Sequence, residues 1–355
     1  FACRPAQLKQ PIGQCTPDGL SAGNPILPAT KEKYQAESDW QDAGVSSLSF
    51  VRTYRSGWAL DAVDTSAKLG PGWGHNHAWQ LIHSPDGLRT SVVMPEGHNR
   101  SFTKQAGSSG TWIASNGADV LTEVGGAWVY KRAEDDGVLT FNSDGKLQTR
   151  TERGGLGYAY TYDGTGRLAT VSNGFGRTLA LAYAGDLLAT VTAPDGRVIG
   201  YSYDTQGRLA TVIYPDGKSR GFLYESSTFP NALTGIVDEA GARLGTFAYN
   251  SQGQAISTEY AGGAGRYEVS YPGFGAQIKD PLGTTREYRY QANLGNLAVS
   301  YATRPSGSGQ PDMGWRVQDA NGLITSETDF NSVVTRTTWD VTRRLPTSVT
   351  RASGT

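Results

Sequence analysis

YDGTGRLATV, at residues 162–171, is followed by an almost identical stretch, YDTQGRLATV, at residues 203–212. The two starts lie 41 residues apart, and a weaker copy begins between them, at Tyr183. A phrase that recurs at a fixed interval indicates that one small structural unit is stacked several times along the chain. The sequence therefore predicts a repeat protein, in which many residues serve the repeat and few serve chemistry.

The true interval is about half of the doubled phrase. Tyrosines recur roughly every 20 to 25 residues from Tyr162 to Tyr271, and turns of the Asp-Gly type recur between them. Glycine accepts the positive φ of a tight turn, and an aspartate side chain caps the backbone of its own turn. Each unit is therefore expected to be a β-hairpin with an Asp-x-x-Gly turn and a Pro-Asp-Gly turn. The residues that define the repeat are Tyr162, Asp163, Gly166, Arg167, Leu168, Tyr203, Asp204, Gly207, Arg208, Leu209, Asp195, Gly196, Asp216 and Gly217.

Tyrosines occupy every second position within the expected strands, as in residues 158–162, with small or polar residues between them. Side chains alternate across a strand, so the tyrosines lie on one face and successive hairpins build an aromatic ladder there. The opposite face is too polar for the core of a sandwich. We therefore expect an all-β fold, a spiral of YD-repeat hairpins in a single layer, with both faces partly exposed to water.

Composition and charge exclude several classes of function. Charged residues make up 18% of the chain, the net charge is −1 and the isoelectric point is about 6.5. A chain without a basic surface is a poor ligand for nucleic acid, so no nucleic-acid partner is expected. No apolar run approaches the 18 residues of a membrane-spanning helix, so no membrane span is expected either.

Three regions are expected along the chain. Residues 1–35 contain five prolines, which interrupt strands and helices, and should form an irregular leader. Residues 36–150 carry six of the eight tryptophans and short alternating apolar stretches, which predicts an N-terminal β-domain that precedes the repeats. Residues 151–355 should form the hairpin spiral. Helices should be few and short, because no window has the apolar spacing of an amphipathic helix.

The cysteines, Cys3 and Cys15, both lie in the leader. Their short spacing in an irregular segment fits a local disulfide, which would indicate an oxidising compartment. Two free thiols are the alternative. The chain has no initiator methionine and no apolar signal region, so we expect it to be a processed or trimmed product.

Several phrases resemble the YD repeats of Rhs proteins, a family that includes bacterial polymorphic toxins. The two quoted stretches and Tyr-Pro-Asp-Gly at residues 214–217 are similar to its repeats. The stretches at residues 23–26, 50–56 and 70–75 are similar to the domain that precedes those repeats. The motifs follow the family's order over most of residues 20–290, which makes the resemblance specific.

The resemblance implies a β-hairpin shell that encloses a C-terminal toxin or effector domain used in bacterial competition. The implied partners are the remainder of its own polypeptide or a toxin domain, together with a component of a secretion machine. The implied location is secreted or on the bacterial cell surface. The sequence lacks the family's closing core segment and a toxin domain, so we expect a fragment or a partner component.

Three features suggest chemistry, and each has a simpler interpretation. Asp280-Pro281-Leu282-Gly283 is similar to the family's self-cleavage motif, but it stands in phase with the turns and lacks the family's preceding proline, which favours a repeat turn. His75 and His77 would share one face of a strand and could hold a metal, but no third ligand is evident, which favours packing against tryptophans. The acidic stretches at residues 134–137 and 142–145 lack the spacing of calcium loops, which favours hairpin turns.

The predicted function is structural, with no catalytic residue, no metal and no cofactor. No hydrolase or phosphate-loop motif is present. We predict a shell fragment of an exported Rhs-type polypeptide that encapsulates or presents a toxin or effector. Two alternatives stay open. One is an extracellular adhesin or glycan-binding module with Trp58 and Trp112 as candidate glycan contacts, and the other is a carboxylate-based glycan hydrolase.

Overall fold

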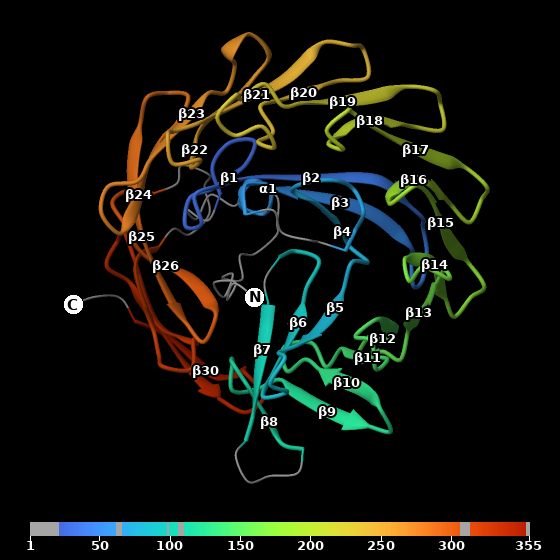
Figure 1. The fold of residues 1–355 in the computed structure, drawn as a ribbon. Helices are drawn as coiled ribbons and strands as arrows, with labels where there is room; N and C mark the ends of the chain where they lie inside the picture. The colour runs from blue at the N-terminus through green and yellow to red at the C-terminus, as the bar shows by residue number, and fades with distance from the viewer. Residues whose placement is uncertain (1–20, 62–65, 98, 106–109, 306–312, 353–355) are drawn as a thin grey trace. The chain divides into compact units, whose positions relative to one another are not determined.

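The computed structural model of the chain describes residues 21–61, 66–97, 99–105, 110–305 and 313–352 (Figure 1). These residues form an all-β protein whose helices are one five-residue α-helix and one short 3-10 helix. The predicted fold class is confirmed, and no helix in the described ranges is long and apolar enough to span a membrane. Cys3 and Cys15 lie outside the described residues, so the disulfide stays a prediction.

The chain forms two compact units. The central unit consists of Gln35–Ser115 and Asp119–Leu244, and the terminal unit consists of Phe1–Tyr34, Asn116–Ala118 and Gly245–Thr355. Each unit therefore combines a stretch of the expected N-terminal region with a stretch of the repeats. The sequence placed its boundaries elsewhere, after residues 35 and 150.

The first half of the central unit contains two small sheets. Its elements are β2 (Glu32–Gln41), which begins in the terminal unit, β3 (Ser49–Arg55), α1 (Ser56–Leu60), β4 (Trp73–His75), β5 (Gln80–His83), β6 (Arg89–Val93), β7 (Asn99–Lys104) and β8 (Trp112–Ala114). Strands β2, β3 and β4 neighbour one another in that order, and β5 to β8 form an antiparallel meander. Residues 35–61 and 66–83 are called the N-terminal segment below.

The second half of the central unit contains the YD strands. They are β9 (Val120–Val124), β10 (Ala127–Lys131), β11 (Val138–Phe141), β12 (Leu147–Thr151), β13 (Gly157–Tyr162), β14 (Leu168–Asn173), β15 (Thr178–Ala184), β16 (Leu187–Thr192), β17 (Val198–Tyr203), β18 (Leu209–Ile213), β19 (Ser219–Leu223) and β20 (Gly235–Val237). Neighbours in the chain pair antiparallel. A register shift precedes Tyr162, Tyr183 and Tyr203, so each of these tyrosines follows a β-bulge, which locally increases the twist of the strand.

The terminal unit repeats the hairpin architecture. Its elements are β1 (Ile26–Leu27), β21 (Arg243–Tyr249), β22 (Ala255–Tyr260), the 3-10 helix η1 (Ala261–Gly263), β23 (Tyr267–Ser270), β24 (Gly275–Lys279), β25 (Thr285–Asn293), β26 (Asn296–Ala302), β27 (Met313–Gln318), β28 (Ile324–Asp329), β29 (Val334–Asp340) and β30 (Leu345–Ala352). Ile26 lies in a core formed with Val269, Ile278, Tyr288 and Val299. The short strand β1 thus covers apolar residues of the hairpins that surround it.

The tyrosine face of the central unit is buried, so the expectation of two partly wet faces is wrong for this unit. Tyr160 is 4% exposed and Tyr201 is 7% exposed, whereas the intervening Thr161 and Ser202 are exposed. Directly paired with Tyr160, Val171 is completely buried, and burial of a side chain of that size contributes roughly 1.5–3 kcal/mol. The N-terminal segment supplies the cover, since β2, β3 and β4 lie against this face (Figure 1).

Candidate functional site

The Asp-x-x-Gly turns of the YD strands are closed by their own side chains. Asp163 Oδ1 accepts the backbone N–H of Arg167 at 3.0 Å, and the guanidinium of Arg167 donates to Oδ2 at 2.8 Å. Asp204 and Arg208 repeat both contacts at 3.0 and 2.6 Å. The glycine of the turn, Gly166, has a φ of +85°, which a side chain would strain. These contacts are those of residues that shape a turn.

The other turns use the same device. Backbone N–H groups of the residues after the turn glycine reach Asp195 and Asp216 at 3.1 Å, and Gly196 and Gly217 have positive φ. In the terminal unit, Asp280 accepts backbone N–H groups at 2.9 Å and an ion pair from Arg286 at 2.6 Å. The stretch at residues 280–283 is therefore built as a turn between β24 and β25.

Each YD hairpin is tied to the preceding hairpin through its tyrosine. The Tyr162 hydroxyl donates to the carbonyl oxygen of Leu147 at 2.9 Å, fifteen residues earlier in the chain. The same bond recurs from Tyr183 to Leu168, from Tyr203 to Leu188 and from Tyr224 to Leu209, at 2.8, 2.7 and 3.0 Å. The guanidinium of the turn arginine lies over the next tyrosine ring, 4.5 Å from its centroid for Arg167 and Tyr183. Tyrosine, leucine and arginine of the motif therefore join neighbouring hairpins.

A buried ion pair joins the N-terminal segment to the tyrosine face. Arg52 on β3 donates from Nε and Nη2 to the Asp39 carboxylate on β2, at 2.5 and 2.7 Å, and both side chains are completely buried. The Tyr201 hydroxyl of β17 donates to the same carboxylate at 2.9 Å. Rings of Trp73 and Phe222 lie 5.0 and 5.1 Å from the guanidinium. Two charges from the N-terminal segment thus depend on aromatic groups of the YD strands.

Further polar contacts fix the segment at defined strands. Trp73 Nε1 donates to the Tyr224 hydroxyl at 2.8 Å, and Arg220 Nη1 donates to Glu37 at 2.6 Å. The Tyr54 hydroxyl donates to the Asn231 carbonyl oxygen at 3.0 Å. Because each bond has a single partner at a single strand, the segment has one register on the tyrosine face.

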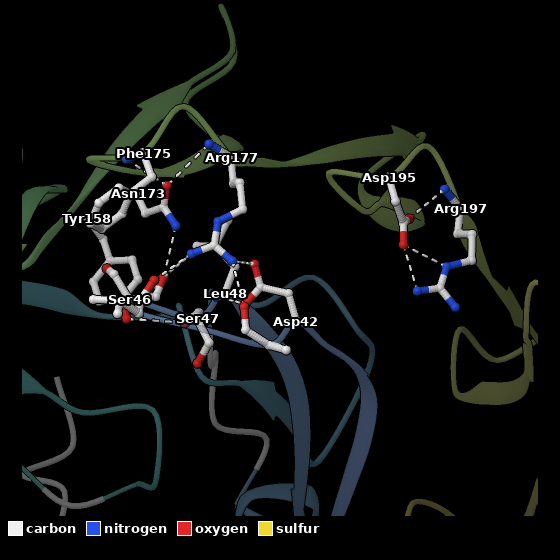
Figure 2. A network of polar contacts seen from close by, with 12 residues as sticks. Asp42, Ser46, Ser47, Leu48, Tyr158, Asn173, Phe175, Arg177, Asp195 and Arg197 are labelled. Carbon is white, nitrogen blue, oxygen red and sulfur yellow. Dashed lines mark hydrogen bonds and ion pairs between the residues drawn. The ribbon is translucent and has the colours of Figure 1, made fainter.

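The loop between β2 and β3 is held at one edge of the YD strands (Figure 2). Arg177 donates to the Asp42 carboxylate at 2.5 Å and to the carbonyl oxygens of Ala43 and Val45 at 2.9 and 2.5 Å. Asn173, from the same turn, donates to the Ser46 carbonyl oxygen at 2.8 Å. One hairpin turn thus binds almost the whole loop.

The next turn on that edge has the same side-chain chemistry without the loop. Arg197 pairs with Asp195 of its own turn, and the two side chains are 60% and 43% exposed (Figure 2). In the pair formed by Arg177 and Asp42, the corresponding values are 28% and 12%. The two arginines therefore form a matched pair of positions, of which Arg177 is the one that contacts the N-terminal segment.

Replacing Arg177 with alanine is expected to release the loop at residues 42–48 without unfolding the central unit. The change removes charge-assisted hydrogen bonds, and the loss of even one such bond raises the open population about tenfold. Elastase, which cuts after small residues, should therefore cleave at Ala43 or Val45 at least about tenfold faster. Arg197→Ala should leave the rate unchanged. Equal rates in the two variants would contradict the role of Arg177.

The opposite edge of the YD strands also contacts the N-terminal segment. The backbone N–H of Leu81 donates to the Gly145 carbonyl oxygen at 2.9 Å, and that of Leu188 donates to the Lys68 carbonyl oxygen at 2.8 Å. Gly145 has a φ of +75°, and a Cβ there would overlap the Leu81 carbonyl oxygen. Glycine is required at this position by both conformation and contact.

The two candidate metal-binding histidines lie in the core. His75 and His77 are buried beside Phe50, with ring centroids 5.0 and 6.3 Å away. Burial lowers the pKa of His75 to about 3 and that of His77 to about 4, so both rings are neutral at neutral pH. Within the described ranges, no three His, Cys, Asp or Glu side chains come together as metal ligands.

The acidic turn at residues 134–137 and the two candidate glycan contacts have protein partners. Asp135 pairs with Arg132 and Asp136 with Arg153. Trp58 is 3% exposed, and its ring packs against Gly97 and Gly74, so no ring face is free for a sugar. Trp112 is half-buried in edge-to-face contact with Trp128.

Sequence reasoning missed the polar residues that join the segment to the strands, namely Arg52, Asp39, Arg177, Asp42, Arg220 and Glu37. Arg177 carried one available signal, because it follows a turn glycine as Arg197 does while its turn lacks the aspartate. An arginine deprived of its local partner is a candidate for a distant one. The location of that partner, more than 130 residues away, had no signal in the sequence.

Stacked hairpins with a recurring turn and a recurring tyrosine bond define a β-hairpin repeat protein, with a preceding segment docked on the tyrosine face. The teneurin YD-shell family matches residues 128–328, and a domain of unknown function (DUF6531) matches residues 23–102. The first match covers more than half of the chain, and the chain therefore belongs to the teneurin YD-shell family. The resemblance to YD-repeat proteins is confirmed.

Solved structures show distant likeness to the chain. Crystal structures of TcdB2-TccC3-Cdc42 and of TcdB2-TccC3 are each 10% identical over 90% of this chain, with TM-scores of 0.39. The chain spans 21% and 22% of the length of those two chains. A porin-like protein from Bacteroides uniformis is 13% identical, over 66% of this chain and 92% of its own, with a TM-score of 0.22. No curated protein matches the chain.

Proposed function

We propose that the chain is a wall section of an exported YD-repeat shell that encloses or presents a toxin or effector domain of the same polypeptide. The observation that carries the proposal is the buried tyrosine face, which holds a second protein segment through fixed polar contacts such as Tyr201 to Asp39. A wall built in this way can support protein on one face while the other face meets water. Membership of the teneurin YD-shell family supports the same role.

The carboxylates of the turns argue against a glycan hydrolase. Backbone hydrogen bonds from Arg167 hold the pKa of Asp163 below its usual range. Burial raises the pKa of Asp280, but hydrogen bonds from Arg286 and from backbone N–H groups lower it further. A hydrolase needs one carboxylic acid with a raised pKa as its general acid. The turn aspartates have the opposite shift, and the buried Trp58 weakens the glycan-binding alternative.

Protease protection tests the proposed function. The full polypeptide encoded by the gene that contains this chain would be purified and treated with proteinase K, beside its C-terminal region produced alone. The C-terminal region is expected to survive in the full polypeptide under conditions that digest it when alone. Equal rates of digestion, or a gene that encodes no further domain, would refute the proposal. Secretion to the outside of the cell is tested separately, by fractionation of the producing bacterium.

A further inference from the structure

A cavity of about 710 Å³ lies in the central unit, beside the turns of two YD hairpins. Its walls come from residues 66–68 and 75–83 of the N-terminal segment and from the turns at residues 143–146 and 162–168. Antiparallel hairpins turn alternately at two edges of a sheet, so this cavity lies at the edge opposite to the loop that Arg177 holds. Its volume is within the range of pockets that bind small molecules.

Two lysines give the cavity uncompensated positive charge. Arg167 also lines the wall, but Asp163 neutralises it at 2.8 Å and the Gly185 carbonyl oxygen accepts its Nη1 at 2.5 Å. Lys68 and Lys146 form no ion pair with any carboxylate in the described part of the chain. The Lys146 ammonium lies 5.5 Å from the centroid of the Tyr162 ring, which also lines the cavity.

The remaining ionisable groups of the wall do not cancel this charge. Burial lowers the pKa values of His75, His77 and His83, so these rings carry no charge at neutral pH. Asp144 is the one carboxylate among the described lining residues, and it is exposed. Two ammonium groups against one exposed carboxylate leave a net positive potential, which a low-dielectric wall strengthens.

The backbone at Lys68 is held in an unfavourable conformation. Lys68 has a φ of +56° and Ser66 a φ of +55°, a region that residues other than glycine visit at a cost of about 1–2 kcal/mol. The Lys68 carbonyl oxygen accepts the Leu188 N–H at 2.8 Å, which fixes the residue in place. Strain of this kind in a loop that lines a pocket is typical of positions where a side chain is oriented for a ligand.

We propose that this cavity binds a small molecule through a phosphate or carboxylate group held between Lys68 and Lys146. Ammonium groups make charge-assisted hydrogen bonds to oxyanions, and these are about twice as strong as neutral ones. The Tyr162 ring and the Leu168 side chain provide a surface for the uncharged part of the ligand. This site is independent of the shell function and of the loop at residues 42–48.

Isothermal titration calorimetry of the 355-residue chain with pyrophosphate and with citrate tests the proposal. At least one anion is expected to bind with one-to-one stoichiometry. Lys68→Met and Lys146→Met should each weaken binding by at least about tenfold, because each removes a charge-assisted hydrogen bond. Tighter binding of pyrophosphate would assign the site to phosphate ligands, and tighter binding of citrate would assign it to carboxylates.

Lys218 offers the matched control, because it follows Asp216-Gly217 as Lys146 follows Asp144-Gly145, and it is exposed away from the cavity. Lys218→Met should leave both affinities within about twofold. Lys146→Arg, which keeps the charge, should retain binding and so separates loss of charge from loss of fold. Absence of binding by both anions, or equal weakening by Lys218→Met and Lys146→Met, would overturn the proposal.

Discussion

Replacing Arg52 with methionine is expected to lower the free energy of unfolding by about 3–5 kcal/mol, because the change leaves the Asp39 carboxylate buried without its counter-ion. Both side chains are completely buried, so water cannot solvate the remaining charge. Burial lowers the pKa of Arg52, but the Asp39 charge raises it more, which leaves it above its ordinary value. Urea denaturation followed by tryptophan fluorescence measures the loss.

A second variant separates charge from packing. Adding Asp39→Asn to Arg52→Met removes the stranded charge while keeping an acceptor for the Tyr201 hydroxyl, and should recover at least half of the lost stability. Arg197→Met, at the exposed pair with Asp195, is the control and should change stability little. If the double variant is no more stable than Arg52→Met alone, the buried charge is not the cause of the loss.

Acid is expected to destabilise the central unit well above the pH at which its carboxylates titrate. His75 and His77 have folded pKa values of about 3 and about 4, whereas an unfolded histidine titrates near 6.5. Between those values the unfolded chain binds more protons than the folded chain. Stability is therefore complete above pH 6.5 and falls as the pH decreases toward 4, by about 1.4 kcal/mol for each pH unit and each histidine.

Urea midpoints measured between pH 7 and pH 4 check this slope. A variant with His75→Gln and His77→Gln should lose most of the pH dependence between 6.5 and 4, although it is less stable at neutral pH. His83, which is only partly buried, serves as the control, and His83→Gln should retain nearly the whole slope. An unchanged slope in the double variant would assign the acid sensitivity to other groups.

Local features of the fold could be predicted from the sequence because local physics causes them. Asp163 and Gly166 define a turn through a side-chain cap and a positive φ, and both requirements are visible in ten residues. The alternation of Tyr158, Tyr160 and Tyr162 likewise places these side chains on one face. Strand class, hairpin period and the family resemblance followed from such patterns.

The cover of the tyrosine face could not be predicted in the same way. Alternation tells which residues share a face, but the group that buries Tyr201 is Asp39, which lies 162 residues earlier in the chain. Hydrogen-bond partners at that separation leave no periodic signal in one sequence. The same reason hid the pairing of Arg177 with Asp42 and led to the wrong expectation of a wet inner layer.

The tyrosine bonds have a consequence for how the chain is made. Each donor, such as the Tyr183 hydroxyl, reaches a carbonyl group fifteen residues nearer the N-terminus, in this case that of Leu168. A ribosome releases the N-terminal side first, so the acceptor is already outside when the donor emerges. Every new hairpin thus finds its docking point complete, and assembly can proceed one hairpin at a time in the direction of translation.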